Sequence, residues 1–230
     1  MKVFVTAALL AVMAAPGSAQ IVGRAPDDSP FRSLEFRQDV TLFTGWFDAG
    51  RDPAGVAPQD GAMVGARYSI RLAGPVDFMA RTAFVFSERT VLNPRLGEAD
   101  RVVGVESWPI MMVDANFTMN VTGQKSWHGL VPVVAGGIGL VSDFKAEADT
   151  GGFQFGTSFA FNLGAGLRWV ATERMELRLD YTDYMYKIGY PSLYYLRAPD
   201  NTQVVPNTQP RSFWRHNAAL TLGAAYRFWR

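Results

Sequence analysis

The chain ends in the stretch Leu220-Thr221-Leu222-Gly223-Ala224-Ala225-Tyr226-Arg227-Phe228-Trp229-Arg230. In a β-strand, successive side chains point to opposite faces, so Leu220 and Leu222 share one face while Thr221 and Arg227 share the other. The end of a soluble chain usually frays in water, which makes an apolar terminal strand unexpected there. Such a strand suits a transmembrane β-barrel, in which the last strand pairs with the first and its apolar face contacts lipid.

The same alternation of apolar and polar residues recurs along the whole chain. It predicts strands over residues 38–47, 62–72, 76–87, 106–121, 128–142, 153–170 and 175–186, and a last strand from residue 212 into the C-terminal stretch. The connections between them alternate long and short, as expected when both ends of a barrel lie in the periplasm. An even strand number is also typical of bacterial single-chain barrels. The sequence therefore predicts an all-β fold, a transmembrane eight-stranded antiparallel up-and-down β-barrel.

A lipocalin-like soluble barrel is the alternative, because it also has eight strands but turns its apolar face inward around a ligand. Here the polar face carries glycines and closely spaced opposite charges, which favours a packed polar interior. The apolar face ends in Trp, Tyr and Phe near the loops and turns. Aromatic residues at those levels are typical of the girdles of membrane barrels.

The N-terminus predicts export. Lys2 precedes an apolar run and a small-residue cleavage site, so residues 1–19 read as a signal peptide. Residues 20–36 lack a sustained period and are expected to form a periplasmic N-terminal segment, which leaves residues 37–230 for the barrel.

Without Lys2 the formal charge falls from +1 to about zero, so no basic surface for nucleic acid is expected. The chain contains no cysteine, which excludes disulfides and thiolate chemistry.

The terminal strand resembles the C-terminal β-signal of bacterial outer-membrane proteins. In that pattern a polar residue is followed by glycine two positions later and by aromatics three and five positions after the glycine. Thr221, Gly223, Tyr226 and Phe228 fill these positions. The chain departs from the pattern in its extra Trp229-Arg230, since most such proteins end at the final aromatic. The resemblance implies insertion by the barrel-assembly machinery.

Three further segments are similar to the OmpA/OmpX-like small outer-membrane barrels. They are residues 132–140, with a proline before a Gly-x-Gly run, and the hairpin formed by residues 162–168 and 177–181. The resemblance implies the outer membrane of a Gram-negative-type bacterium, both termini in the periplasm, and contact with outer-membrane lipids and lipopolysaccharide. Because the sequence stops at the eighth strand, we expect no peptidoglycan-binding domain like that of OmpA itself.

Strand phase places many charged residues on the inward face. They are Asp39, Arg67, Arg71, Asp77, Arg81, Asp114, Arg168, Glu176, Arg178, Asp180 and Arg227. An eight-stranded barrel is only just wide enough to be filled by its own side chains, so opposite charges there should pair. The favoured interpretation is a polar plug that blocks flow, because the two signs nearly balance. An ion-selective or gated path is the alternative, although a selective pore favours one sign.

Enzymes that act on lipid A occur on small outer-membrane barrels and use an outward His and Ser. His216 is predicted on the lipid side near the outer leaflet, but Ala218 stands where the serine would be. Ser212 is four residues away, about 13 Å along a strand, which is too far for proton transfer. His128 is predicted at the periplasmic rim. We therefore expect no catalytic residue, and no phosphate loop, zinc spacing or calcium loop indicates a cofactor or metal.

The long loops are the remaining candidate site. Tyr190, Tyr194 and Tyr195 lie among prolines and arginines in residues 187–211, a composition typical of recognition patches. These tyrosines alternatively belong to the upper aromatic girdle.

The preferred function is a non-enzymatic surface barrel with a charge-plugged interior, which supports the envelope or binds an extracellular ligand or envelope protein through its loops. A narrow passive or gated porin-like channel is the alternative, and a lipid A-modifying enzyme is the third hypothesis.

Overall fold

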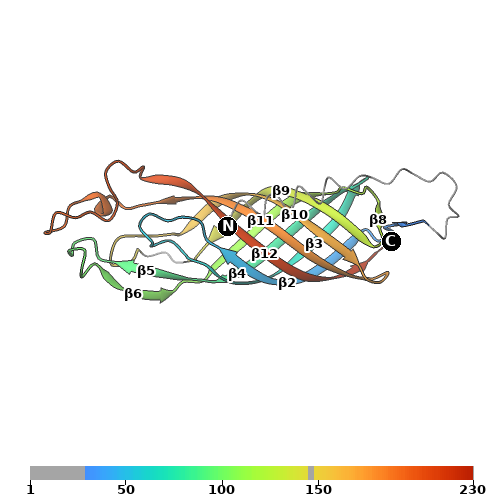
Figure 1. Cartoon of the computed structure of the whole chain (residues 1–230), viewed down its shortest axis with the longest axis horizontal. Helices are drawn as coiled ribbons and strands as arrows, with labels where there is room; N and C mark the ends of the chain where they lie inside the picture. The colour runs from blue at the N-terminus through green and yellow to red at the C-terminus, as the bar shows by residue number, and fades with distance from the viewer. Residues whose placement is uncertain (1–28, 145–147, 230) are drawn as a thin grey trace. The chain divides into compact units, whose positions relative to one another are not determined.

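The computed structural model describes residues 29–144 and 148–229. Its strands form one closed antiparallel barrel, in which each strand pairs with its neighbours in the order β2-β3-β4-β7-β9-β10-β11-β12 and β12 returns to β2 (Figure 1). The eight strands are β2 (Gln38–Asp48), β3 (Gly61–Ala73), β4 (Val76–Phe86), β7 (Ile110–Asn120), β9 (Leu130–Ser142), β10 (Thr157–Val170), β11 (Met175–Gly189) and β12 (Ser212–Phe228). The predicted eight-stranded up-and-down barrel is confirmed.

The terminal strand closes the barrel as its sequence predicts. β12 pairs with β2 in a register that sets Phe228 opposite Gln38 and Leu220 opposite Trp46. Leu220 and Leu222 are 54% and 56% exposed, whereas the intervening Thr221 is 3% exposed. The apolar face of the strand therefore points outward and the polar face points into the barrel.

The same outward apolar face extends around the barrel and ends in two levels of exposed aromatic side chains. Near the long loops these are Trp46, Phe84, Phe86, Phe159, Phe161 and Trp214. Near the short turns they are Tyr68, Phe117, Trp127, Trp169 and Tyr226. Because the apolar face lies outside and the charged face inside, the barrel has the opposite polarity to a lipocalin.

The short turns are built from local signals. Gly74 occupies the left-handed region with φ +55° between β3 and β4, a conformation that glycine adopts without strain. At the β10–β11 turn, the Thr172 hydroxyl accepts a hydrogen bond from the backbone N–H of Met175 at 3.0 Å. These connections are compact because each turn satisfies its own backbone or side-chain polar groups.

Four short elements lie outside the barrel strands. They are β1 (Phe31–Ser33), β5 (Glu88–Leu92), β6 (Val102–Ser107) and β8 (Lys125–Trp127), and a 3-10 helix, η2, spans Ser192–Tyr195. β5 and β6 pair with each other as a hairpin beyond the barrel (Figure 1). In the described residues no helix has the length and apolar character needed to cross a membrane.

Some predicted boundaries are wrong. The connection between the predicted strands 76–87 and 106–121 contains most of the β5–β6 hairpin, and the strand predicted from 106 begins at Ile110. The segment predicted to start at 153 begins as a strand at Thr157, because Phe153 and Phe155 are buried among the loops. Part of the N-terminal lead-in is also a strand, since β1 pairs with β8. The predicted signal peptide, residues 1–19, and residues 20–28 lie outside the described residues.

Candidate functional site

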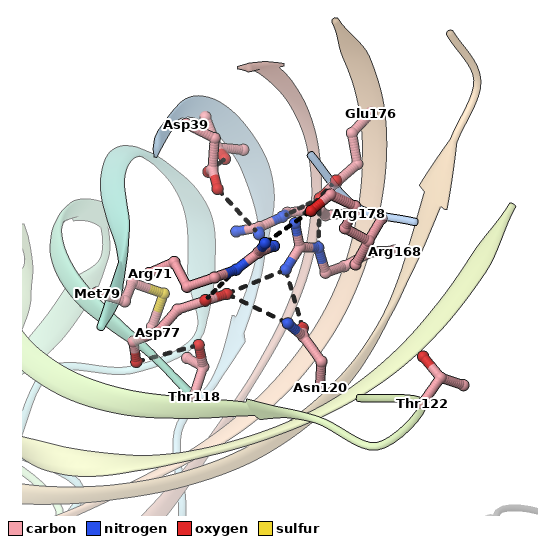
Figure 2. Close-up of polar contacts among 12 residues, drawn as sticks. Asp39, Arg71, Asp77, Met79, Thr118, Asn120, Thr122, Arg168, Glu176 and Arg178 are labelled. Atoms are coloured by element: carbon pink, nitrogen blue, oxygen red, sulfur yellow. Dashed lines mark hydrogen bonds and ion pairs between the residues drawn. The ribbon is translucent and has the colours of Figure 1, made fainter. Parts of the chain in front are cut away.

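The short turns lie at one end of the barrel, which we call the turn end, and the long connections lie at the other, the loop end. At the turn end the interior of the barrel holds a continuous set of ion pairs (Figure 2). At the centre is Glu176 on β11, whose carboxylate is almost completely buried. Arg168 donates to it through Nε at 2.7 Å and Nη2 at 3.0 Å, and Arg178 donates through Nε at 2.7 Å. Two arginines on one carboxylate leave an excess positive charge, which the neighbouring carboxylates must balance.

Those carboxylates come from two other strands of the barrel, β2 and β4. Asp39 on β2 lies 3.4 Å from Nη2 of Arg178, and Asp77 on β4 lies 3.3 Å from Nη1 of Arg168. Asp77 also lies 3.6 Å from Nε of Arg71, whose Nη1 donates to the backbone carbonyl of Leu34 at 2.7 Å. Figure 2 shows these side chains converging from several strands into the barrel. The network therefore links five strands of the barrel, β2, β3, β4, β10 and β11.

A second set of ion pairs lies next to the first. Arg81 donates through Nε to both carboxylate oxygens of Asp114, at 3.1 and 3.0 Å, and through Nη1 to the hydroxyl of Thr182 at 3.1 Å. Arg67 lies 2.7 Å from Asp180 and stacks over the ring of Phe43. Each guanidinium thus has a charged partner, which is the condition for burying it without a large penalty.

Arg227, the last of the predicted interior residues, lies at the turn end. Its guanidinium is 5.3 Å from the centroid of the Phe36 ring, and both residues are buried. Leu34 and Phe36 lie just before β2, so the residues that lead into the first barrel strand contribute to this end of the interior. Sequence periodicity alone does not reveal this contribution, because the segment has no alternating pattern.

The structure brings together the set of interior residues named from the sequence. We call this set the charged interior: Asp39, Arg67, Arg71, Asp77, Arg81, Asp114, Arg168, Glu176, Arg178, Asp180 and Arg227. Among these side chains, a void lined by Arg67, Arg81, Arg168 and Arg178 has a volume of about 20 Å³. A void of that size holds about one water molecule. The side chains therefore fill the barrel at this level.

The interior at the loop end is apolar. Phe47, Met63, Ile110, Tyr184 and Tyr186 from the strands form one buried cluster with side chains from the long connections. The connections supply Val56, Phe153, Tyr194 and Val205. We call the described parts of connections 49–60, 87–109, 143–156 and 190–211 the loop cap. The loop cap therefore has a hydrophobic core of its own that continues the barrel interior.

Arg89 is the charged centre of the loop cap. Its side chain is completely buried, and it forms an ion pair with Asp149 of the following long connection. Its guanidinium lies over two rings, 4.3 Å from the centroid of Trp108 and 4.9 Å from that of Phe153. The sequence gives no periodic signal for this residue, because it belongs to a hairpin predicted as loop.

Polar contacts join the four long connections to one another. Tyr190 donates a hydrogen bond to Asp52, which joins the first connection to the fourth. Arg101 donates to Thr202 and to the backbone carbonyl of Gln203 at 3.2 Å, which joins the second to the fourth. The backbone N–H of Glu98 donates to Asp200 at 2.7 Å. With the Arg89–Asp149 pair, these contacts make the loop cap one connected unit.

The three loop tyrosines lie in this core rather than on the surface. Tyr190, Tyr194 and Tyr195 are buried, and the rings of Tyr190 and Tyr194 stack with centroids 6.0 Å apart. Burial raises the pKa of Tyr194 to about 12, an effect that the charge of Arg89 partly offsets. The structure corrects both sequence interpretations, an exposed recognition patch and a membrane girdle. The reason is that the loops pack on each other and draw the aromatic rings inward.

The two histidines belong neither to the charged interior nor to the core of the loop cap. His216 on β12 points outward and is 68% exposed, and its Nδ1 lies 2.7 Å from a carboxylate oxygen of Asp183 on β11. Sequence reasoning missed this partner, which follows from the β11–β12 register. His128 lies at the turn end beside the Trp127 ring. Across the described residues, no group of three or more His, Cys, Asp or Glu side chains is placed to hold a metal.

The residues of the β-signal pattern occupy both faces of β12. Thr221 points inward, and Gly223 lies where an added Cβ would come within 2.8 Å of Thr41. Tyr226 points outward and its hydroxyl accepts a hydrogen bond from Arg174 at 3.0 Å. Phe228 pairs with Gln38, and its ring lies 6.5 Å from that of Tyr68. Recognition of this pattern by the assembly machinery stays a prediction.

Comparison with solved structures finds small outer-membrane barrels. Neisserial surface protein A (NspA) has 12% sequence identity and a TM-score of 0.50, over 83% of this chain and 97% of that one. The N-terminal β-barrel domain of OprF from Pseudomonas aeruginosa has 13% identity and a TM-score of 0.48, over 84% and 98%. The outer membrane protein OprG from the same species has 12% identity and a TM-score of 0.48, over 85% and 98%.

Similarity at this level of identity concerns the fold alone. The likeness to NspA agrees with the OmpA/OmpX-like architecture predicted from the sequence. No protein-family model matches the sequence, and no curated protein matches it.

Proposed function

We propose that this protein is a non-enzymatic outer-membrane barrel whose interior is closed and whose loop cap is presented outside the cell. One observation carries the proposal: side chains fill the barrel from the charged interior at the turn end to the apolar loop cap. A protein built in this way supports the envelope or binds through its outer surface. The cap is held by its own core and by contacts among its loops, so it would present a fixed surface to a partner.

An outer-membrane location is part of the proposal. The outward face is apolar and carries exposed aromatic residues at two levels, which is the surface that lipid requires. The short turns lie at the end where both the first and last barrel strands terminate. In bacterial barrels short turns face the periplasm, so both ends of the barrel would lie there and the loop cap outside.

The partners follow from this placement. We propose outer-membrane lipids and lipopolysaccharide around the apolar band, and the barrel-assembly machinery during insertion. An extracellular ligand or envelope protein would contact the exposed side of the loop cap. The buried tyrosines of the cap would hold its shape and would not themselves contact such a partner.

A narrow gated channel is the second candidate function. The observation in its favour is that the interior is polar at the turn end, where ion pairs that exchange partners could admit water. Single-channel recording of the refolded protein in a planar bilayer tests both functions. We expect no steady conductance, because two closed levels lie in series. Steady openings that change ion selectivity on Asp114→Asn would overturn the closed-barrel proposal.

The enzyme hypothesis has less support. A His–Asp pair such as His216–Asp183 orients an imidazole, but nucleophilic catalysis also needs a hydroxyl close to it. On the same strand the predicted serine position is occupied by Ala218. Mass spectra of lipid A from cells with and without the protein test this point. We expect identical spectra, and loss of an acyl chain that depends on His216 would restore the enzyme hypothesis.

A further inference from the structure

A pocket of about 600 Å³ opens beside the barrel, under the connection between β2 and β3. Its lower wall is the outward barrel surface, with Trp46, Ala62 and Phe86, and its upper wall includes Asp60 and Glu88. We call these residues the flank pocket. None of the residues that line it belongs to the charged interior, and the proposed function assigns it no role.

The strand register gives the lower wall its shape. Ala62 on β3 is directly opposite Trp46 on β2 and directly opposite Phe86 on β4. Strands lie about 4.8 Å apart, so the two aromatic side chains start about 10 Å apart with a methyl group between them. Trp46 and Phe86 are 56% and 57% exposed, so their rings are accessible from the pocket. Ala62 therefore forms the base of a groove between the two aromatic side chains. This groove, which we call the notch, is about as wide as a compact organic group.

The notch continues along the barrel. Below Ala62, the outward residues of β3 are Val64 and Ala66, which are smaller than the outward Phe84 of β4. The pocket therefore adjoins the apolar outer surface of the barrel. A ligand in the notch could therefore extend an alkyl chain downward.

The pocket has an excess of negative charge. Three carboxylates, those of Asp52, Asp60 and Glu88, line it together with one guanidinium, that of Arg215. Arg215 is buried and donates to the backbone carbonyls of Gly50 and Pro58, at 2.9 and 3.0 Å for its Nε and Nη1. Asp52 accepts hydrogen bonds from the backbone N–H groups of Ala54 and Ala57. Arg215 and Asp52 therefore already use their charged groups in hydrogen bonds within the protein.

The other two carboxylates remain available. Asp60 accepts one hydrogen bond, from the backbone N–H of Ala49 to its Oδ1 at 2.7 Å, and Glu88 makes no side-chain hydrogen bond to a described residue. Neither forms an ion pair with an arginine, lysine or histidine of the described chain. Two exposed carboxylates above two exposed aromatic rings attract a cation and repel an anion.

We propose that the flank pocket binds an organic cation that carries an alkyl chain, such as an alkylammonium amphiphile. The ammonium group would lie between Trp46 and Phe86, beneath Asp60 and Glu88, and the chain would follow Val64 and Ala66. Aromatic faces and carboxylates together are the chemistry that recognises alkylated ammonium groups. The inference goes beyond the proposed function and rests on it only for the level of the pocket in the bilayer.

Titration calorimetry on the refolded full chain in a non-ionic amphipol tests the proposal, because this medium contains no competing cation or phospholipid. The probes are hexyltrimethylammonium, hexyl sulfate and hexyl glucoside, which share one chain and differ in the charge of the headgroup. We expect saturable binding of the cation and none of the sulfate. Equal binding of the cation and the sulfate would overturn the proposal, since the pocket would then select only the chain.

Variants locate the site. We expect the pair Asp60→Asn with Glu88→Gln to weaken binding of the cation by roughly tenfold, and Trp46→Leu or Phe86→Leu by several-fold. Glu98→Gln and Phe159→Leu are the matched controls, because both residues are exposed at the loop end but do not line the pocket. The difference in gel mobility between unheated and boiled samples shows that each variant is folded before titration. Unchanged affinity in folded pocket variants would overturn the proposal.

A second measurement uses the unmodified protein. A quaternary ammonium probe with a benzophenone in its chain is irradiated with the protein, and the labelled peptides are identified by mass spectrometry. We expect labels within residues 44–66 or 82–88, and labels confined to other strands would overturn the proposal. Conductance measurements are independent of this result, so failure of the flank pocket and failure of the closed-barrel function are distinguishable.

Discussion

The two halves of the barrel interior are closed by different kinds of interaction. At the turn end, the charged interior consists of arginines and carboxylates paired both between neighbouring strands and between strands that are not neighbours. At the loop end, an apolar cluster surrounds the Arg89–Asp149 ion pair, in which the arginine side chain is completely buried. The first half depends on charges that share partners, whereas the second depends on packing around buried arginines that each bind separate partners. Loss of one charge should therefore affect its neighbours at the turn end and stay local at the loop end.

The largest expected effect comes from the turn end. Glu176→Gln removes the shared carboxylate of Arg168 and Arg178 and leaves two buried guanidinium groups with an excess of positive charge. Breaking a buried ion pair in this way costs about 3–5 kcal/mol. Urea unfolding in lipid vesicles measures the loss, and Glu106→Gln on the exposed β6 is the control, with an expected change below about 0.5 kcal/mol. A loss as small as the control's would mean that the network does not act as a unit.

A smaller and more local effect is expected at the loop end. Arg89→Met keeps the contact with Trp108 and Phe153 but leaves Asp149 without its charged partner. Asp149 is half-buried and still accepts hydrogen bonds from the backbone N–H groups of Gly151 and Phe153, so we expect a cost of only about 1–3 kcal/mol, confined to the loop cap. Proteolysis of the loops and hydrogen exchange should become faster while the unfolding midpoint of the barrel stays unchanged. The exposed Arg95→Met is the control, and an equal drop in barrel stability would break the distinction between the two halves.

The Tyr194 hydroxyl tests how apolar the loop cap is. Its pKa is raised from 10.0 to about 12 by burial, so the unfolded chain loses this proton at a lower pH than the folded chain does. The cap should therefore lose stability as the pH rises from about 10 to about 12. Protease resistance of the loops between pH 9 and 12 measures the effect. Tyr194→Phe should remove this part of the pH dependence, and an identical profile in the variant would contradict the assignment.

The smallest effect is expected at the surface of the loop cap. The pKa of Asp200 is lowered from 3.8 to about 2 by hydrogen bonds from the Thr202 hydroxyl and from the backbone N–H groups of Glu98 and Thr202. Its stabilising contribution is present above pH 3.8 and is lost as the pH falls through about 2. NMR titration of the carboxylate measures this pKa directly. Asp200→Asn should slightly loosen the contact at Glu98, and Asp100→Asn serves as the control.

The sequence predicts the barrel well because a two-residue period reports directly which face of a strand is buried. Arg168, Glu176 and Arg178 could be placed in the interior from strand phase alone, and the balance of charges could be foreseen. Their individual partners could not, because the pairing of Arg168 with Asp77 depends on strands that are far apart in the sequence and face each other across the barrel.

The loop cap could not be predicted in the same way. Arg89, Asp149 and Tyr194 lie in connections without periodicity, and their burial results from packing between loops. The composition around Tyr190, Tyr194 and Tyr195 does not distinguish a binding surface from a core. The flank pocket was missed for a related reason. Trp46 and Phe86 are brought together by register, with Ala62 between them, and not by proximity along the chain.

The pairing of β12 with β2 also has a consequence for how the chain reaches its final state. Gln38 meets Phe228, so nearly the whole sequence must be made before the first strand finds its second neighbour. Contacts between distant parts of a sequence form slowly, and until then two strand edges stay open to the wrong partners. Asp39 and Arg178 likewise meet only after closure. Ring closure and completion of the ionic network should therefore be one late kinetic event.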